Sequence, residues 1–252
     1  TETKSSAASD VYKRQVPPRA RTDAVKLVRP VIESGTMADV SRAGNRLHSL
    51  RRPGVIAATA VTGLVTSYAV AVQDPIPAWE LDLTEWINGA PDVVARLLYP
   101  IMQLGTLGGP ILVAAAVGYF RRDWWLSAAT VSAGLITWFG AKGVKAVVDR
   151  GRPGAYLSEI NIREGEGTGL GYISGHSAVA ACAAVMAMTV VPARWRPVLA
   201  AIAGLVGVAR VVHGVHLPAD LVGGWSFGTL IALGALALLD RIEPTRRDHN
   251  AD

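Results

Sequence analysis

Three short polar clusters, each at the end of an apolar segment, hold most of the side chains in this sequence that could do chemistry. They are residues 145–153 (KAVVDRGRP), 174–176 (SGH) and 210–220 (RVVHGVHLPAD). A charge held at bilayer depth costs roughly 2.5–3.5 kcal/mol on insertion scales, so ionisable residues within apolar sequence indicate a function. Three cations that converge with two imidazoles predict a site for phosphate chemistry.

The first cluster supplies two of these cations, Lys145 and Arg152. A continuing helix would place both on one face, because their separation is close to two full turns. Pro153 allows little further helix, since the residue before a proline is pushed out of the α region. A planar Arg fork beside a Lys point charge can bind a phosphate; the alternative is that both side chains snorkel to the membrane interface.

The second cluster, Ser174-Gly175-His176, precedes an alanine-rich stretch. Ser174 suits a helix N-cap, and the first amides of a helix form an anion site. Gly175 would let backbone N–H groups approach a phosphoryl oxygen. His176 would then stand beside the anion, placed to give a proton to a leaving group. Taken alone, the tripeptide also fits a capped helix without any chemistry.

The third cluster contains Arg210, His216 and Asp220 and is the most specific of the three. His216 and Asp220 are four residues apart and can meet on one helical turn, with Pro218 tolerated in the first turn. A carboxylate bonded to one imidazole nitrogen fixes the tautomer and leaves the other nitrogen free as a nucleophile. His213 has no obvious partner, so we expect it to have a structural or supporting role.

Long apolar segments must position these clusters. Half of the residues are hydrophobic and 18% are charged, and several apolar runs are uninterrupted. Runs of about 17–25 such residues match a hydrocarbon core of about 30 Å. We therefore predict an all-α polytopic membrane protein with six transmembrane helices in a bundle. The expected spans are residues 55–72, 101–120, 124–141, 173–191, 198–212 and 221–239.

The charges of the connections predict an orientation. Basic pairs occupy alternate connections, whereas residues 74–92 form an acidic connection. The positive-inside rule then places both termini in the cytoplasm and all three clusters on the extracytoplasmic side. Nucleic-acid binding is not expected, because the basic residues are dispersed and form no basic face. The basic pairs are Arg51/Arg52, Arg121/Arg122, Arg194/Arg196 and Arg246/Arg247.

At this point the sequence resembles the type 2 phosphatidic acid phosphatase superfamily, whose signature reads K-x6-R-P, then P-S-G-H, then S-R-x5-H-x3-D. The first motif is complete. The second has Ile173 where the family usually has Pro, and the third has Ala209 where Ser is usual. The change at Ile173 should soften the turn before Ser174, and the change at Ala209 removes at most a minor contact. The resemblance covers residues 145–224.

The resemblance implies metal-independent hydrolysis of a lipid phosphomonoester or pyrophosphate through a phosphohistidine, without a cofactor. His216 would be the nucleophile, Asp220 its orienting carboxylate and His176 the proton donor to the departing oxygen. The phosphoryl oxygens would be held by cations and by donors at the start of the helix. These are Lys145, Arg152, Ser174, Gly175 and Arg210. A lipid tail would enter between the helices, and residues 154–172 could cover the head group.

Two alternatives belong to other classes. The vanadium-dependent haloperoxidases are similar at the same motifs, because vanadate mimics phosphate, but they are typically soluble and the six expected spans argue against them. A non-catalytic lipid-binding membrane protein is the second alternative, and the intact set of His, Asp and cations argues against it. Four lipid classes fit the site equally well. They are polyprenyl pyrophosphate, phosphatidylglycerol phosphate, phosphatidic acid and a lipid-linked sugar phosphate.

The chain is expected to have three parts. Residues 1–50 form a polar, disordered cytoplasmic segment, residues 51–240 the six-helix membrane phosphatase domain, and residues 241–252 a disordered cytoplasmic tail. The first methionine is Met37, so residues 1–36 are expected to be an upstream extension outside the native protein. Cys182 is the single cysteine and lies in an apolar stretch, which excludes an internal disulfide and a cysteine metal cluster.

Overall fold

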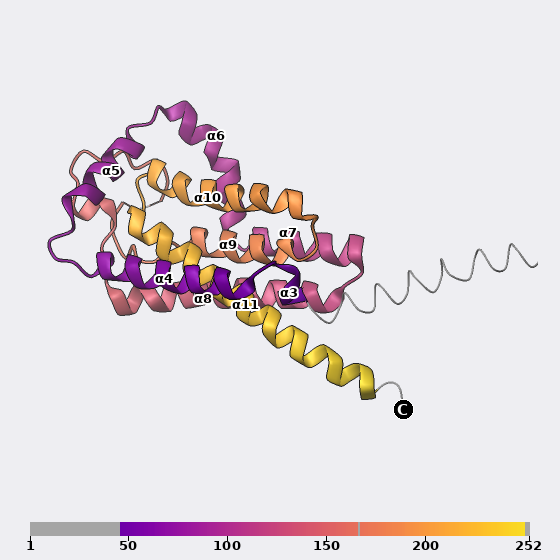
Figure 1. Cartoon of the computed structure of the whole chain (residues 1–252). Helices are drawn as coiled ribbons and strands as arrows, with labels where there is room; N and C mark the ends of the chain where they lie inside the picture. The colour runs from indigo at the N-terminus through magenta and orange to yellow at the C-terminus, as the bar shows by residue number, and fades with distance from the viewer. Residues whose placement is uncertain (1–45, 166, 250–252) are drawn as a thin grey trace, which may run out of the picture. The chain divides into compact units, whose positions relative to one another are not determined.

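The computed structural model describes residues 46–165 and 167–249, with side chains as far as Glu243. The described residues form helices and loops, with one isolated antiparallel bridge between Gly151 and Leu170 (Figure 1). The all-α class is therefore confirmed. The α-helices are α3 (Arg46–Ser49), α4 (Pro53–Ala71), α5 (Ala78–Asn88), α6 (Asp92–Met102), α7 (Gly108–Ala116), α8 (Trp124–Val148), α9 (Gly175–Met188), α10 (Arg196–Val212) and α11 (Pro218–His249).

Four of the described helical segments are long and apolar enough to cross a membrane. They are Pro53–Ala71, Trp124–Val148, Ala193–Val212 and Pro218–Glu243. A fifth results if Asp92–Gly105 and Gly108–Arg121 count as one span, although these two segments meet at a bend of 66°. The chain is thus a membrane protein, and the expected number of six spans is not confirmed.

Two of the six expected spans differ from the structure. The span expected at residues 101–120 begins earlier, at Asp92, and is bent where a 3-10 turn, Gln103–Gly105, interrupts it. The span expected at residues 173–191 is α9, which has 14 residues. At 1.5 Å per residue that is about 21 Å, shorter than a hydrocarbon core of about 30 Å.

Helix α9 lies inside the bundle. Every residue from Ser177 to Ala187 is buried, and α9 packs against α7, α8, α10 and α11. Its many alanines allow these neighbours to approach closely, as small residues do in membrane bundles. The closest approach is to α11, where a Cβ on Gly228 would come within 1.9 Å of the Ala178 carbonyl oxygen. Small side chains on both helices therefore set the position of α9.

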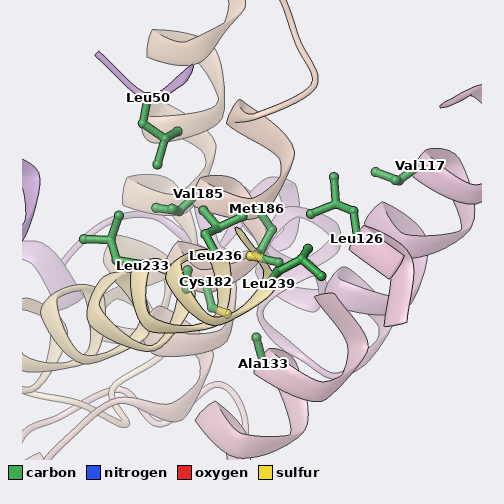
Figure 2. Close-up of a cluster of buried hydrophobic side chains, with 11 residues drawn as sticks. Leu50, Val117, Leu126, Ala133, Cys182, Val185, Met186, Leu233, Leu236 and Leu239 are labelled. Atoms are coloured by element: carbon green, nitrogen blue, oxygen red, sulfur yellow. The ribbon is translucent and has the colours of Figure 1, made fainter. Parts of the chain in front are cut away.

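A buried apolar cluster fills the bundle at the end away from the three polar clusters (Figure 2). Side chains of α8, α9 and α11 meet there, including Leu126, Met186 and Leu236, none of which has exposed surface. Leu50, from the segment after α3, packs against the same cluster. This core anchors the helices whose other ends carry the polar residues.

Helices occupy parts of the two polar ends of the chain. Residues 1–45 lie outside the described part, but α3 follows directly, and its Arg46 is buried against Asp123 at 2.7 Å and against Glu243. Helix α11 continues past Arg241 to His249. The disorder expected for residues 1–50 and 241–252 stays a prediction. The ion pairs of Arg46 join it to acids far away in sequence.

We expect Gly228→Ala to destabilise the fold and Gly234→Ala to leave it unchanged. The first substitution forces α11 away from α9, and over-packing of this kind costs about 1–3 kcal/mol. Gly234 is on the same helix and has nothing within 4 Å of an added Cβ. Thermal unfolding in detergent should show a lower midpoint for Gly228→Ala alone. Equal midpoints for the two variants would contradict the close packing described here.

Candidate active site

The two cations of the first cluster lie close together, but they are not on one helix as expected. Helix α8 ends at Val148 because Asp149 adopts the left-handed conformation, with φ of 51°. The expected helical continuation to Arg152 is therefore wrong. The two cations still converge, because Lys145 Nζ and Arg152 Nε donate to the Leu170 carbonyl at 3.2 and 3.4 Å. A returning loop, and not helical spacing, brings them together.

The second cluster opens α9, as predicted. Ser174 is the N-cap, and its Oγ accepts a hydrogen bond from an amide in the first turn. Its own backbone N–H donates to the Asp220 carbonyl at 2.9 Å, which ties the second cluster to the third. Gly175 is the first residue of the helix. His176 is half-buried, with its ring 6.2 Å from that of Trp138, centroid to centroid.

The third cluster is organised by the buried carboxylate of Asp220. Its Oδ2 lies 3.1 Å from Nδ1 of His216 and accepts the Leu217 N–H at 2.9 Å. Its Oδ1 accepts Nη1 of Arg150 at 2.9 Å. The predicted contact between His216 and Asp220 is confirmed. Because Nδ1 of His216 faces the carboxylate, its Nε2 is left for another partner.

His216 is held as a neutral ring. Burial, as the largest effect, lowers the pKa of His216 well below its ordinary value. The positive charges of Lys145, Arg210 and Arg152 lower this pKa further, and a hydrogen bond from the ring to the backbone of Gly171 raises it. The three cations predicted for an anion site therefore act on one imidazole. A neutral imidazole is the form that can attack phosphorus.

Arg210 is buried and already has an anionic partner. Its Nη1 donates to Glu164 at 2.8 Å and lies 3.3 Å from the Met102 sulfur, while its Nε has no acceptor among the described residues. Glu164 belongs to the segment of residues 154–172, which was expected to cover a head group. This carboxylate thus forms an ion pair with a guanidinium that was predicted to hold phosphate.

His213 has the contacts of a structural residue. It is buried at the C-terminal end of α10, with Nδ1 2.7 Å from the Ala209 carbonyl. The ring of Tyr99 lies 6.3 Å away, centroid to centroid. These contacts agree with the expected structural role, and they make His213 a useful comparison for His216.

The sequence analysis missed two charged residues, Glu80 and Arg150. Both are buried, and Arg150 binds Glu80 with two guanidinium nitrogens while it also binds Asp220. Glu80 was noted only as part of an acidic connection, and Arg150 only as a member of the first cluster. Their sequence gives one signal in retrospect. Glu80, Thr84 and Asn88 recur at every fourth position and form a polar stripe on α5.

The cations of the site differ in whether a carboxylate is paired with them. Arg150 pairs with two buried carboxylates, Glu80 and Asp220. Lys145 donates to backbone carbonyls of Leu170 and Gly171, which leaves its charge uncompensated by a direct ion pair among the described side chains. A tetrahedral oxyanion placed beside His216 would find an excess of positive charge. Such a site can stabilise charge that develops on phosphoryl oxygens.

A family model with the description PAP2 superfamily matches residues 122–243 of this chain, and that region contains all three clusters. Over these residues the chain is similar to this superfamily. An undecaprenyl-diphosphatase of Sulfolobus acidocaldarius is 34% identical over 89 residues, which are 35% of this chain and 43% of that protein. The match therefore spans less than half of the relative's length.

Two solved structures resemble the fold. The Aquifex aeolicus LpxE structure has a TM-score of 0.58 at 21% identity, covering 64% of this chain and 96% of LpxE. The first transmembrane PAP2 type phosphatidylglycerolphosphate phosphatase from Bacillus subtilis has a TM-score of 0.61 at 20% identity. That likeness covers 74% of this chain and 96% of the phosphatase. At 20–21% identity, both comparisons show a similar arrangement of helices and nothing about activity.

We expect Glu164→Gln to bind orthovanadate more tightly than the wild type. Glu164 competes for Arg210, and a partly exposed ion pair contributes about 0.5–1 kcal/mol, so affinity should rise about two- to fivefold. Glu159→Gln is the matched control, because Glu159 is exposed in the same loop. Calorimetric titration in detergent measures both. Equal affinities for the two variants would show that Glu164 does not compete with an oxyanion.

Proposed function

We propose that this chain is an integral membrane lipid phosphatase that hydrolyses a lipid phosphomonoester or pyrophosphate through a phosphohistidine. The observation that carries the proposal is the neutral His216, with Nδ1 against Asp220, under the charges of Lys145, Arg152 and Arg210. The match to the PAP2 superfamily model supports it, as do the names of the relatives, each a phosphatase or a diphosphatase where the name states an activity.

The proposed reaction has two steps. In the first, Nε2 of His216 attacks phosphorus, a P–N bond forms, and the P–O bond to the lipid breaks while His176 gives a proton to the departing oxygen. In the second, water attacks the phosphohistidine, gives a proton to His176 and releases inorganic phosphate. The first step needs a neutral His216 ring, which its lowered pKa provides, and the second step releases the ring again as a neutral imidazole when the P–N bond breaks.

Asp220 and the phosphate-binding groups have supporting roles in this proposal. Asp220 holds the tautomer with hydrogen on Nδ1 and stabilises the positive charge that the ring gains on attack. Lys145, Arg152 and Arg210 hold the phosphoryl oxygens, together with Ser174 and the Gly175 amide at the start of α9. Glu164 must leave Arg210 when the substrate binds, so the loop that carries it would respond to the head group.

We also propose that catalysis needs no metal. Positive charge is already supplied by side chains, and no group of three or more His, Cys, Asp or Glu residues suited to a metal gathers among the described residues. Phosphate release from a panel of the four candidate lipids should therefore survive excess EDTA and fall with orthovanadate. Halide oxidation in place of phosphate release would favour the haloperoxidase alternative. Loss on chelation, with recovery on adding Mg²⁺ or Zn²⁺, would contradict metal independence.

We expect His216→Ala to abolish turnover and Asp220→Asn to leave a slow residual rate. The first substitution removes the nucleophile, whereas the second disturbs the tautomer and should lower kcat on the order of 10⁴-fold. His213→Asn is the matched control, because His213 is as buried as His216 and lies in the same segment. The side-chain amide of the introduced Asn can keep the hydrogen bond to the Ala209 carbonyl. Substantial activity in His216→Ala would exclude the proposed nucleophile.

We further propose six membrane-spanning segments with both termini in the cytoplasm. The bent pair α6–α7 and the buried helix α9 would be the two spans beyond the four long helices. The catalytic clusters would then face the extracytoplasmic side, where the enzyme would act on head groups of the outer leaflet. The basic connections at Arg121/Arg122 and Arg194/Arg196 support this orientation.

Cysteine accessibility tests the orientation. Single cysteines at Glu159 and Arg194, both exposed, are placed in a Cys182→Ala background and treated in intact cells with a membrane-impermeant thiol reagent. We expect labelling at position 159 only, because residues 154–172 lie on the extracytoplasmic side in this proposal. Labelling at position 194 alone would invert the topology. Permeabilised cells, in which both positions should react, provide the control for access.

A further inference from the structure

Helix α5 presents a polar stripe to the protein interior. Glu80 and Thr84 have no exposed surface and Asn88 is buried, whereas Trp86 on the same helix is 78% exposed. An amphipathic helix on a globular core normally buries its apolar face. The reversed arrangement requires polar partners inside the bundle, and Figure 1 shows α5 at the end where the loop between α8 and α9 lies.

Glu80 finds those partners at the candidate active site. Its carboxylate binds both terminal nitrogens of Arg150, and its Oε1 also accepts the Ala219 N–H at 2.8 Å. Ala219 is in the first turn of α11, where backbone N–H groups lack partners within the helix. Glu80 thus holds both the start of α11 and the guanidinium of Arg150.

Arg150 connects Glu80 to the catalytic pair. Its Nη1 donates to Oδ1 of Asp220 at 2.9 Å, while the other oxygen of Asp220 faces Nδ1 of His216. The order of contact is therefore Glu80, Arg150, Asp220, His216. Both carboxylates are wholly buried, and the Arg150 side chain is 2% exposed. Buried, bidentate contacts of this kind fix side-chain geometry closely.

We infer that Glu80 is a positioning residue for the reaction, acting on His216 through Arg150 and Asp220. This inference rests on the proposed function, because it assigns Glu80 a role in that reaction. When both carboxylates are ionised, Glu80, Asp220 and Arg150 together carry one net negative charge beside His216. Without Glu80, the whole charge of Arg150 would act on Asp220. Asp220 would then stabilise an imidazolium less well and hold the Nδ1–H tautomer less firmly.

The experiment compares Glu80→Gln with Glu85→Gln in the full chain in detergent. Glu85 is exposed on the same helix and loses the same charge. For Glu80→Gln we expect kcat to fall about 10- to 100-fold, as for residues that orient a catalytic ligand, with KM within about twofold. The acidic limb of kcat/KM should move to lower pH, because removing a nearby negative charge lowers the pKa of His216. Glu80→Asp, which keeps the charge, should recover part of the rate.

A second measurement does not depend on activity. Histidines labelled with ¹⁵N report the tautomer of each ring by NMR, and the His216 signal is assigned by its loss in His216→Ala. We expect the Nδ1–H tautomer to dominate in wild type and in Glu85→Gln, and a mixture of tautomers in Glu80→Gln. If wild type releases no phosphate from any lipid, the proposed function fails, and the His216 signal still shows whether Glu80 acts on this ring.

Glu80→Gln leaves a buried cation short of an anion, which can prevent folding. The double variant Glu80→Gln/Arg150→Met removes both charges and tests the inference in that case. We expect it to fold and to keep the low kcat, because Asp220 Oδ1 has lost its partner. A folded double variant with wild-type kcat and a single His216 tautomer would overturn the inference. The inference would also be overturned if Glu80→Gln had the kcat, the pH profile and the His216 tautomer of the wild type.

Discussion

The carboxylate of Asp220 has no exposed surface, and a buried anion persists only where donors surround it. Its donors come from the backbone of Leu217, from His216 and from Arg150, while its own carbonyl accepts the Ser174 N–H. These contacts tie the segment after α8, the start of α9 and the start of α11 to one residue. The arrangement of the three polar clusters therefore depends on the hydrogen bonding of Asp220.

The membrane context makes this dependence strict. Polar groups inside an apolar bundle have few alternative partners, so each one must be satisfied by another group of the protein. Glu80 forms an ion pair with Arg150, and Glu164 forms one with Arg210. The apolar remainder of the bundle, with α9 at its centre and the core of Figure 2 at the far end, holds these groups at fixed separations. Apolar packing fixes the positions of the helices, and the ion pairs fix the positions of the charged side chains between them.

Sequence reasoning found the residues that carry chemistry and missed those that support them. The spacing of His216 and Asp220 is local, so it predicted their contact correctly, and Ser174 was recognisable as a cap from its neighbours. Lys145 and Arg152 converge through a loop closed by Leu170, which no helical period could indicate. Glu80 reaches Arg150 across 70 residues of chain, so its role is visible only once the fold brings α5 over the site. The same limit applies to α9, whose position inside the bundle is not indicated by its apolarity.

The most direct test of the proposed chemistry is the position of the covalently bound phosphate. Wild-type protein is mixed with a lipid carrying ³²P in its scissile phosphate, quenched within milliseconds in alkaline denaturant, digested and mapped by peptide mass spectrometry. The account predicts an acid-labile, alkali-stable phosphate on the peptide that contains His216, and its absence in His216→Ala. Phosphate on another residue, or no labelled protein while phosphate is released at the normal rate, would contradict it.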